Sequence, residues 1–350
     1  MSGKMFYINN TRLVNKLKND GDLFLLNTEH SLPVFTTKNK KEIYIKFIVS
    51  ARDGSFPLRP LDFLIIDAVY TICREYENEI GSVFSLKDLD RVLLGKTDFS
   101  QDHFLSKKRR DLLKEHLENI MNTYITINFE AEAIARRKTE HKSITISDEP
   151  LLPIEKQGRK YCILNIPPFY KYSSLNEQVI PVPENLFYCR EANLVNNEKN
   201  ILLRYYLIHQ LEIMRTSSKK YNITRIPFLK NPTAISSDTG ILAQVSPKRY
   251  FYEFDENCYI KYKCNIRNDL NKSSTQQYIL NVEKSVIDIL EFYKKEKYLK
   301  NYDISRTIRR KDKAGLPQAI TNVEFFAKYD DTSAEPEGQT DEDVATSIEK

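Results

Sequence analysis

The sequence lacks any long apolar run, which argues against a membrane-spanning helix. No stretch approaches the ~18 uninterrupted apolar residues that such a helix needs. The first twenty residues also lack the apolar segment of a secretory signal, so we expect a cytoplasmic protein that does not contact a membrane. With 41% hydrophobic residues the chain can still bury substantial cores, and its 350 residues suggest two domains.

Cysteine and histidine are scarce, with five of each, and both are scattered along the chain. Only Cys258 and Cys264 lie close in sequence, at a spacing that matches no common zinc site. We therefore expect reduced, mostly buried cysteines, and neither a metal nor any other cofactor. The isolated histidines also argue against a rolling-circle nicking enzyme, which would need paired metal-binding histidines near a catalytic tyrosine.

A complete phosphate-binding loop is missing as well. The segment LLGKT, residues 93–97, resembles the end of such a loop, but the position five residues before Gly95 is Asp90 instead of glycine. The segment also follows a predicted helix, where the motif requires a strand. Asp88 and Asp90 are interpreted as solvated residues on the exposed side of that helix. These absences favour a protein that is not an enzyme.

Positive charge is plentiful and unevenly distributed. The net charge of +5 includes a C-terminal segment, residues 330–350, that carries eight acids against one lysine, a balance of −7. The first 329 residues therefore carry +12. A basic body followed by an acidic tail, which we expect to be disordered, is a common arrangement in proteins that meet nucleic acid. It is equally common in proteins with a solubilising tail.

Helical and strand patterns follow one another in a regular order between residues 58 and 180. They come after an N-terminal arm, residues 1–57, whose segment KKEIYIKFIVS alternates as a strand. A helix is predicted over residues 61–79, and a short one follows Ser85, whose side chain is a good N-cap with Asp88 three positions later.

A longer helix is predicted to begin near Ser106. Leu113, Leu117 and Ile120 give it an apolar face, and the alternating segments YITINF and SITIS follow, joined by a polar loop that contains ARRK. This is the order of a winged helix, in which the third helix lies in the major groove of DNA and the loop between the strands flanks it.

Cations gather at the start of this third helix. Positive charge at a helix N-terminus opposes the helix dipole and costs a few tenths of a kcal/mol per residue, unless an anion binds there. Arginine can pair with guanine, and lysine mostly neutralises phosphate. The alternative is an ordinary solvated helix start. The candidate DNA-binding residues are Lys107, Lys108, Arg109, Arg110 and Lys114 of the helix and Arg136, Arg137 and Lys138 of the loop.

The same order recurs between residues 181 and 329. A first helix is predicted over residues 196–215, and a later helix has Val282, Val286, Ile289, Leu290 and Tyr293 at helical spacing. Two strands follow it, joined by a loop that contains IRRK. Ser and Gln of the segment NKSSTQQY before the helix could contact phosphates or an adenine edge, and the alternative is an ordinary loop with a capping Ser or Thr. The candidate DNA-binding residues of this second unit are Lys284, Arg306, Arg309, Arg310, Lys311 and Lys313. The fold class is therefore predicted as α+β, with two tandem winged helices.

Three segments resemble plasmid-type replication initiators that consist of two tandem winged helices. They are FSLKDLDRVLLGK…LSKKRRDLLKEHLENIMNTYITI, IPVPENLF…NNEKNILLRYYLIHQLEIM and LKNYDI…RRKDKAG…ITNVEFF. The resemblance implies binding to repeated origin sequences in double-stranded DNA, local DNA opening, recruitment of host replication proteins and autorepression as a homodimer. Residues 230–275, longer than the expected turn, and the acidic tail depart from the family pattern.

Two other functions fit the same fold. A winged-helix transcriptional regulator would bind a single palindrome at a promoter, whereas an initiator would bind direct repeats beside an AT-rich tract. A protein-interaction module of the same fold would show no salt-dependent DNA binding. The sequence does not separate these alternatives.

Overall fold

The structure, a computed structural model of the chain, describes residues 4–20, 24–37, 39–52, 58–77, 80–96, 103–136, 144–174, 177–187, 197–216, 224–228, 240–242, 273–306 and 315–326. Helices and strands are mixed along these residues. Buried apolar side chains from Phe6 to Ile320 form one continuous cluster, so the elements share a single core.

In chain order, the described elements begin with a short strand. The first of them are β1 (Met5–Asn9), α1 (Arg12–Asp20), β2 (His30–Thr36), β3 (Glu42–Ala51), α2 (Pro60–Thr71), the π-helical turn η2 (Ile72–Glu77), β4 (Val83–Ser85), α3 (Leu86–Leu93) and α4 (Lys107–Met121). The next elements are β5 (Thr123–Asn128), α5 (Glu130–Ala135), β6 (Thr145–Pro150), β7 (Ile154–Gln157), β8 (Lys160–Ile163), α6 (Pro168–Ser174), β9 (Val179–Pro183) and the 3-10 turn η3 (Glu184–Phe187). The last described elements are α7 (Glu198–Thr216), β10 (Arg225–Pro227), α11 (Ser273–Lys295), β11 (Leu299–Arg306) and β12 (Pro317–Phe325).

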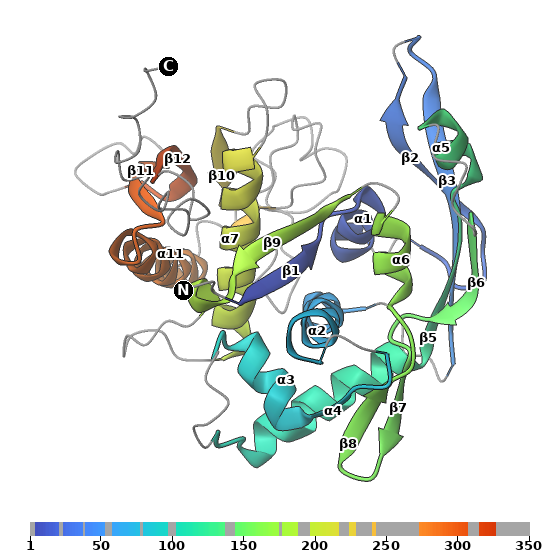
Figure 1. Cartoon of the computed structure of the whole chain (residues 1–350). Coiled ribbons are helices and arrows are strands. Elements are labelled where there is room, and N and C mark those ends of the chain that lie inside the picture. Colours follow the sequence, from blue (N-terminus) through green and yellow to red (C-terminus); the bar gives the residue numbers. More distant parts are fainter. Residues whose placement is uncertain are drawn as a thin grey trace, which may run out of the picture.

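The described strands form four small antiparallel sheets, in the orders β1-β9, β2-β3-β5-β6, β4-β8-β7 and β10-β12-β11. In Figure 1 the β1–β9 pair lies between two groups of elements. One group contains α2, α3, α4 and the β7–β8 hairpin, and the other contains α7, α11 and the β11–β12 hairpin. The sheet with β2 and β3 stands at the outer side of the first group.

The N-terminal segment is built into the fold. β1 pairs with β9, and β3 pairs with β5, both far along the chain. The predicted alternation of β3 is confirmed, because Ile43, Ile45, Phe47 and Val49 are all buried. Residues 1–57 were expected to form an arm, but their described part supplies strands to two sheets.

Local capping signals define the helices of the first group. Ser85 caps α3, because its hydroxyl accepts a hydrogen bond from the Asp88 backbone N–H while the Asp88 carboxylate accepts one from the Ser85 backbone N–H. Ser106 caps α4 by accepting from the backbone N–H of Arg109. Both predicted helix starts are confirmed, and the buried side chains of Leu113 and Leu117 attach α4 to the core.

The hairpin that follows α4 differs from the expected one. β5 and β6 do pair, but they belong to the sheet of β2 and β3, and the helix α5 stands where a polar loop was expected. The strand that pairs with β4 is β8, which forms a tight hairpin with β7 around Gly158 and Arg159. Gly158 has a φ of +64°, a conformation that favours glycine, so it suits this two-residue turn.

The described elements of the second group follow a similar order, without a counterpart of α3. A first helix, α7, is followed by a short strand, β10, and later by the long helix α11 and the β11–β12 hairpin. The five apolar positions predicted for the long helix, from Val282 to Tyr293, are all buried. The helix begins earlier than expected, at Ser273, so the segment NKSSTQQY contributes its first turns and is not wholly a loop.

The two groups share one strand arrangement. In each, the strand that follows the first helix pairs with the last strand of the hairpin, as the orders β4-β8-β7 and β10-β12-β11 show. They pack together through α7: the ring of Tyr205 stacks on Phe187 at 4.1 Å and meets Phe6 edge-on at 4.8 Å. The Tyr205 hydroxyl also lies 3.4 Å from the carbonyl oxygen of Val92 in α3.

Candidate nucleic-acid interface

Two of the cations predicted at the start of α4 extend into solvent. Lys107 and Lys108 are exposed, and the first turn of the helix contains no acidic side chain. The Ser106 hydroxyl accepts from the Arg109 backbone N–H and leaves the dipole of the helix uncompensated by charge, so the positive end of that dipole adds to the charge of the two lysines. The N-terminal end of α4 therefore carries the positive charge that the sequence indicates, and binding of an anion there stays a prediction.

Arg109 has a different position from the one expected. Its Nε donates to Asp90 Oδ1 at 2.8 Å, and its side chain is only 13% exposed. The other oxygen of Asp90 lies 2.8 Å from His103 Nε2, and both of these side chains are buried. Arg109 is thus part of a buried contact between α3 and α4, and we remove it from the candidate DNA-binding residues.

Asp90 was likewise expected to be solvated, and this expectation is wrong. Asp90 lies four residues after Leu86 and three before Leu93, which places its side chain on the buried face of α3. A buried carboxylate needs partners, and the segment before α4 supplies His103 while α4 supplies Arg109. The helical spacing was present in the sequence and could have identified Asp90 as a buried acid.

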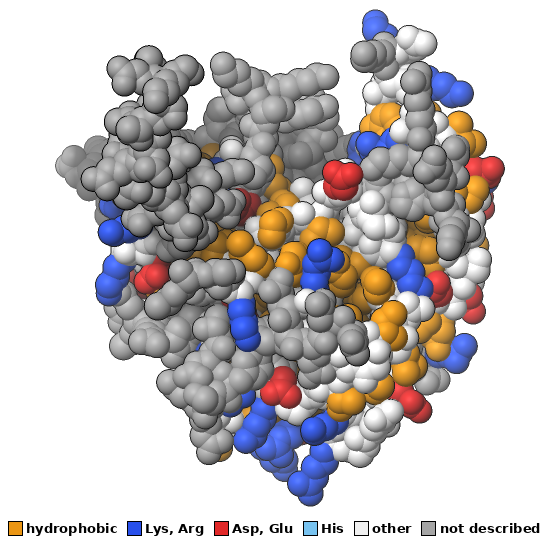
Figure 2. Space-filling view, viewed as in Figure 1, with side chains coloured by type: hydrophobic (Ala, Val, Ile, Leu, Met, Phe, Trp, Pro, Cys, Tyr) orange, Lys and Arg blue, Asp and Glu red, His pale blue; other side chains and the backbone are white. Residues whose placement is uncertain are grey.

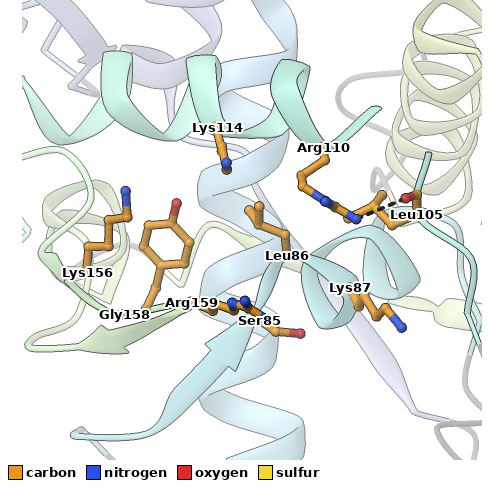
Figure 3. A pocket seen from close by; sticks show the side chains of 10 residues that line it. Ser85, Leu86, Lys87, Leu105, Arg110, Lys114, Lys156, Gly158 and Arg159 are labelled. Carbon is orange, nitrogen blue, oxygen red and sulfur yellow. Dashed lines mark hydrogen bonds between the residues drawn. The ribbon is translucent and has the colours of Figure 1, made fainter. Parts of the chain in front are cut away.

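Arg110 and Lys114 line one side of a cleft between α4 and the β7–β8 hairpin, which we call the α4–hairpin cleft. It has a volume of about 580 Å³. Arg110 Nη2 donates to the Leu105 carbonyl oxygen at 3.5 Å, and Figure 3 shows Arg110 and Lys114 extending from α4 towards the cleft. The cleft is lined by Ser85, Leu86, Lys87, Leu105, Arg110, Lys114, Lys156, Gly158, Arg159 and Tyr161.

The cations of the hairpin were not predicted from the sequence. Lys156 and Arg159 face the cleft, and Lys160 is exposed beside them. The segment KQGRK contains a glycine between basic residues, which is the composition of a basic hairpin turn. The sequence does not identify it as the wing, because the alternation of YITINF and SITIS assigns the two wing strands to earlier segments. Figure 2 shows Lys and Arg side chains gathered at the lower end of the molecule, around α4 and the hairpin.

The outward face of α4 becomes acidic after its first turn. Asp111, Glu115 and Glu118 are exposed, and Glu115 pairs with Arg59 at 3.1 Å. Asp111 and Glu115 are four residues apart and share one side of the helix, whereas Glu118 follows Lys114 by four residues and lies near Tyr161, whose pKa is raised by burial and by Glu118. The basic surface of α4 therefore consists of its N-terminal end and the side that faces the hairpin.

Of the loop cations predicted for the first unit, the structure describes Arg136, which does not lie in a hairpin beside α4. Arg136 ends α5, where its Nε donates to Glu132 Oε1 at 2.9 Å and its guanidinium lies over the Phe35 ring. It is therefore part of the sheet around β3, away from the hairpin that pairs with β4. Arg137 and Lys138 lie outside the described residues.

Of the cations predicted for the second unit, the structure describes Lys284 and Arg306. Lys284 is exposed on α11, but Arg306 at the end of β11 pairs with Glu283 and donates to the Gly315 carbonyl oxygen at 3.0 Å. Burial raises the pKa of Glu283, and the neighbouring Arg306 opposes that rise. The other predicted cations, Arg309, Arg310, Lys311 and Lys313, lie outside the described residues.

A second polar cluster lies inside the first group. The Tyr170 hydroxyl donates to Asp67 Oδ1 at 2.7 Å, and Lys18 Nζ is 3.9 Å from Asp67 Oδ2. Burial raises the pKa of Asp67 to about 6 and lowers that of Lys18. Asp67 and Tyr170 are almost fully buried, so the cluster joins α1, α2 and α6 without offering a surface to a substrate.

In the described ranges, no group of three His, Cys, Asp or Glu side chains is placed to hold a metal ion.

Comparisons with known proteins add little to this description. No protein-family model matches the chain, and no curated protein does. Among solved structures it is similar to selenomethionine derivatives of domains 2 and 3 of RctB, at 11% identity and a TM-score of 0.37, with 90% of this chain and 99% of that chain covered. A likeness at this score carries no argument about function. No helix in the described part of the chain is both long enough and apolar enough to cross a membrane.

Proposed function

We propose that the protein is a non-catalytic, sequence-specific binder of double-stranded DNA that acts as a replication initiator of a plasmid or another mobile element. The observation that carries DNA binding is the convergence of cations from α3, α4 and the β7–β8 hairpin on one side of the first group. Convergence of Lys and Arg from distant parts of a chain is the electrostatic footprint of a nucleic-acid-binding surface.

The order of elements supports a winged-helix interpretation of both groups. In the first, α2, β4, α3, α4 and the β7–β8 hairpin stand in the order of helix, strand, two helices and hairpin, with the hairpin paired to β4. In the second, α7, β10, α11 and the β11–β12 hairpin keep the same strand arrangement. We infer that α4 and α11 are the recognition helices, and that the β7–β8 hairpin is the first wing in place of the β5–β6 pair.

The more specific role as a replication initiator rests on the resemblance of three sequence segments to plasmid-type initiators. That family has two tandem winged helices, and this chain has two groups with one strand arrangement. Origin repeats, host replication proteins and a homodimer are the partners that such a role implies. The acidic tail, residues 330–350, lies outside the described residues.

Titration of the full chain against labelled duplex DNA tests the proposal. We expect the logarithm of the affinity to fall linearly with the logarithm of the salt concentration, by about 0.9 per phosphate contact, between roughly 50 and 200 mM salt. Binding that is absent or insensitive to salt would instead support a protein-interaction module of the same fold.

Footprinting on the DNA that flanks the protein's own gene tests the initiator role. Protection of several direct repeats beside an AT-rich tract is the expected result. Protection of one palindrome at a promoter would support a transcriptional regulator, and would leave DNA binding itself intact.

A further inference from the structure

The five cations that line the α4–hairpin cleft have no acidic partner among the described residues. Elsewhere exposed cations are neutralised in pairs, as where Lys46 lies 2.9 Å from Glu29. The ion pairs between described residues include none of the cleft cations, and no described acid lines the cleft. Like charges repel, so a bound anion relieves this arrangement. The cleft cations are Lys87, Arg110, Lys114, Lys156 and Arg159.

The apolar part of the cleft includes a hydrogen-bond donor. Tyr161 is almost fully buried, its ring is stacked on Phe84, and its hydroxyl makes no hydrogen bond with a described residue. Burial and the neighbouring Glu118 raise the pKa of Tyr161, so its hydroxyl keeps the proton and can donate it to an acceptor. Leu86 and Leu105 add apolar surface. The cleft therefore suits a ligand that combines anionic oxygens with small apolar groups.

The acidic tail of this chain has that chemistry. Residues 330–350, which the structure does not describe, carry eight acids against one lysine. Asp341, Glu342 and Asp343 are consecutive, and Val344 follows them directly. Carboxylates form the strong, charge-assisted hydrogen bonds with Lys and Arg, and they also accept from a phenol hydroxyl. The tail thus matches the cleft in the sign of its charge and in the kind of side chain that it contains.

The shape of the cleft suits a short extended peptide. Arg110 and Lys114 extend from α4 on one side, and Lys156 and Arg159 belong to the hairpin on the other (Figure 3). Pockets of about 300–1,000 Å³ hold drug-sized molecules, so a cleft of about 580 Å³ can hold a few residues of an extended chain. Successive side chains of such a chain point in opposite directions, so consecutive acids can reach the cations on both sides.

The acidic tail is connected closely enough for such a contact within one chain. The last described residue is Phe326, directly after β12. Fifteen residues lead from position 327 to Asp341, and they can span roughly 50 Å when extended, at about 3.3–3.6 Å per residue. A folded chain of this length has a radius of gyration of about 20 Å. The connection therefore spans distances comparable to the size of the fold, and a tethered segment has an effective concentration in the millimolar range.

We propose that the acidic tail docks in the α4–hairpin cleft of its own chain when DNA is absent, and that DNA displaces it. The regulation of DNA binding rests on the proposed function, whereas the docking itself does not. A docked tail lowers the apparent affinity for DNA in proportion to the fraction of chains whose cleft is free. It also neutralises cations in advance, so DNA binding releases fewer counterions and depends less steeply on salt.

Carbodiimide cross-linking of the full-length protein without DNA tests the docking directly. The reagent joins a carboxylate to a lysine amine without a spacer, so it captures ion pairs that exist in solution. Cross-linked peptides of the monomeric fraction are identified by mass spectrometry at low protein concentration. We expect links from the acids of the tail to Lys87, Lys114 or Lys156, and loss of these links at high salt, because salt screens exposed ion pairs.

Lys41 and Lys46 are the control lysines, because they are exposed near and within β3, in another sheet. Links to the control lysines as frequent as those to the cleft would mean that the tail meets cations without preference, and this would overturn the docking. Absence of links to the cleft lysines would overturn it as well. Links that join only two different chains would assign the cleft to the tail of a second copy, which contradicts docking within one chain.

The triple variant Asp341→Asn/Glu342→Gln/Asp343→Asn tests the effect on DNA binding in the full-length protein. The buried core extends from Phe6 to Ile320, so we expect the melting temperature to be retained. If about one cleft in ten is free in the wild type, the variant should bind duplex DNA roughly tenfold more tightly at low salt. Its salt slope should be steeper by about 0.9 for each cation that the tail occupies in the wild type.

Combination of the triple variant with Lys156→Ala/Arg159→Ala distinguishes docking from general repulsion between the tail and DNA. If the tail docks in the cleft, loss of these two cations should remove most of the gain in affinity, whereas the control Lys41→Ala/Lys46→Ala should retain it. An equal gain in both backgrounds would overturn docking in the cleft and leave the proposed function intact. If neither the wild type nor the triple variant binds duplex DNA, the proposed function fails and the regulation fails with it, while the cross-links still decide the docking.

Discussion

The two groups differ most where the long helix meets its hairpin. In the second group Arg306 at the end of β11 pairs with Glu283 of α11, so an ion pair joins the hairpin to the helix. In the first group Lys156 and Arg159 of the hairpin face Arg110 and Lys114 across the α4–hairpin cleft, and none of the described acids lines it. Within the described residues, one strand arrangement thus carries an ion pair at this junction in the second group and cations that face each other in the first.

The comparison also concerns how each long helix is held in place. α11 is attached mainly by apolar side chains, with the Tyr293 hydroxyl reaching the Arg204 carbonyl oxygen at 3.4 Å. α4 has a shorter apolar face and adds the buried contact of Asp90 with His103 and Arg109. The exposed cations of α4 repel each other, and loss of either partner of a buried ion pair is strongly destabilising, so this contact fixes the start of α4 against α3.

Replacement of Asp90 should have the largest effect. In Asp90→Asn the buried guanidinium of Arg109 and the ring of His103 lose the negative charge that they share, and one of the two acceptor oxygens becomes an NH2 donor; removal of one partner of a buried pair costs about 3–5 kcal/mol. We expect the free energy of unfolding to fall by about 3 kcal/mol or more, measured by urea denaturation.

Asp111→Asn is the control for this variant, because it makes the same chemical change at an exposed acid near the start of α4. Its replacement should change the free energy of unfolding by less than about 0.5 kcal/mol. If both variants are equally stable, the contact at Asp90 does not hold α4, and the contrast with α11 loses its physical basis.

Much of this fold could be predicted from local patterns. The N-caps Ser85 and Ser106 and the apolar spacing of α4 and α11 are properties of neighbouring residues, and each appears in the structure as the sequence indicates. Pairing between distant strands is not local. β7 has one buried residue, Ile154, followed by three exposed ones, so it lacks the alternation that would have identified it as a wing strand.

The site could be predicted only in part, for a related reason. The charge of the four residues of KKRR predicts that all of them lie on a polar surface. Arg109 is instead held in a buried contact by Asp90, which is 19 positions earlier in the chain. The hairpin cations were missed because the second and third strands were assigned to an earlier pair, β5 and β6. Which charges remain available for a ligand depends on contacts between distant residues, and one sequence does not reveal these.

The first helices of the two groups carry buried groups whose pKa values shift in opposite ways. Burial lowers the pKa of His209 on α7 to about 3, and burial raises that of Asp67 on α2 to about 6. Between pH 6.5 and 3 the unfolded chain binds the extra proton at His209, so acidification lowers the free energy of unfolding. Between pH 6 and 4 the folded chain binds the extra proton at Asp67, so acidification raises it.

The two effects should nearly cancel in the wild type, and single variants should separate them. From pH 7 to pH 5 we expect Asp67→Asn to lose about 2 kcal/mol of unfolding free energy through His209, and His209→Gln to gain about 1 kcal/mol through Asp67. Urea denaturation at several pH values measures both slopes. Parallel pH profiles for the two variants would mean that the buried groups of α2 and α7 do not differ in this way.

Replacement of Arg306 should have the smallest effect and tests the comparison most directly. The Arg306 side chain is about one-third exposed and is held by Glu283 and the Gly315 carbonyl oxygen, so Arg306→Ala should lower the free energy of unfolding by only about 1 kcal/mol. Because this guanidinium is already neutralised, the salt slope of DNA binding should stay at its wild-type value. A slope lower by about 1 would instead mean that Arg306 leaves Glu283 to contact a phosphate. The junction of the second group would then bind DNA as well, and the two groups would differ only in the unbound protein.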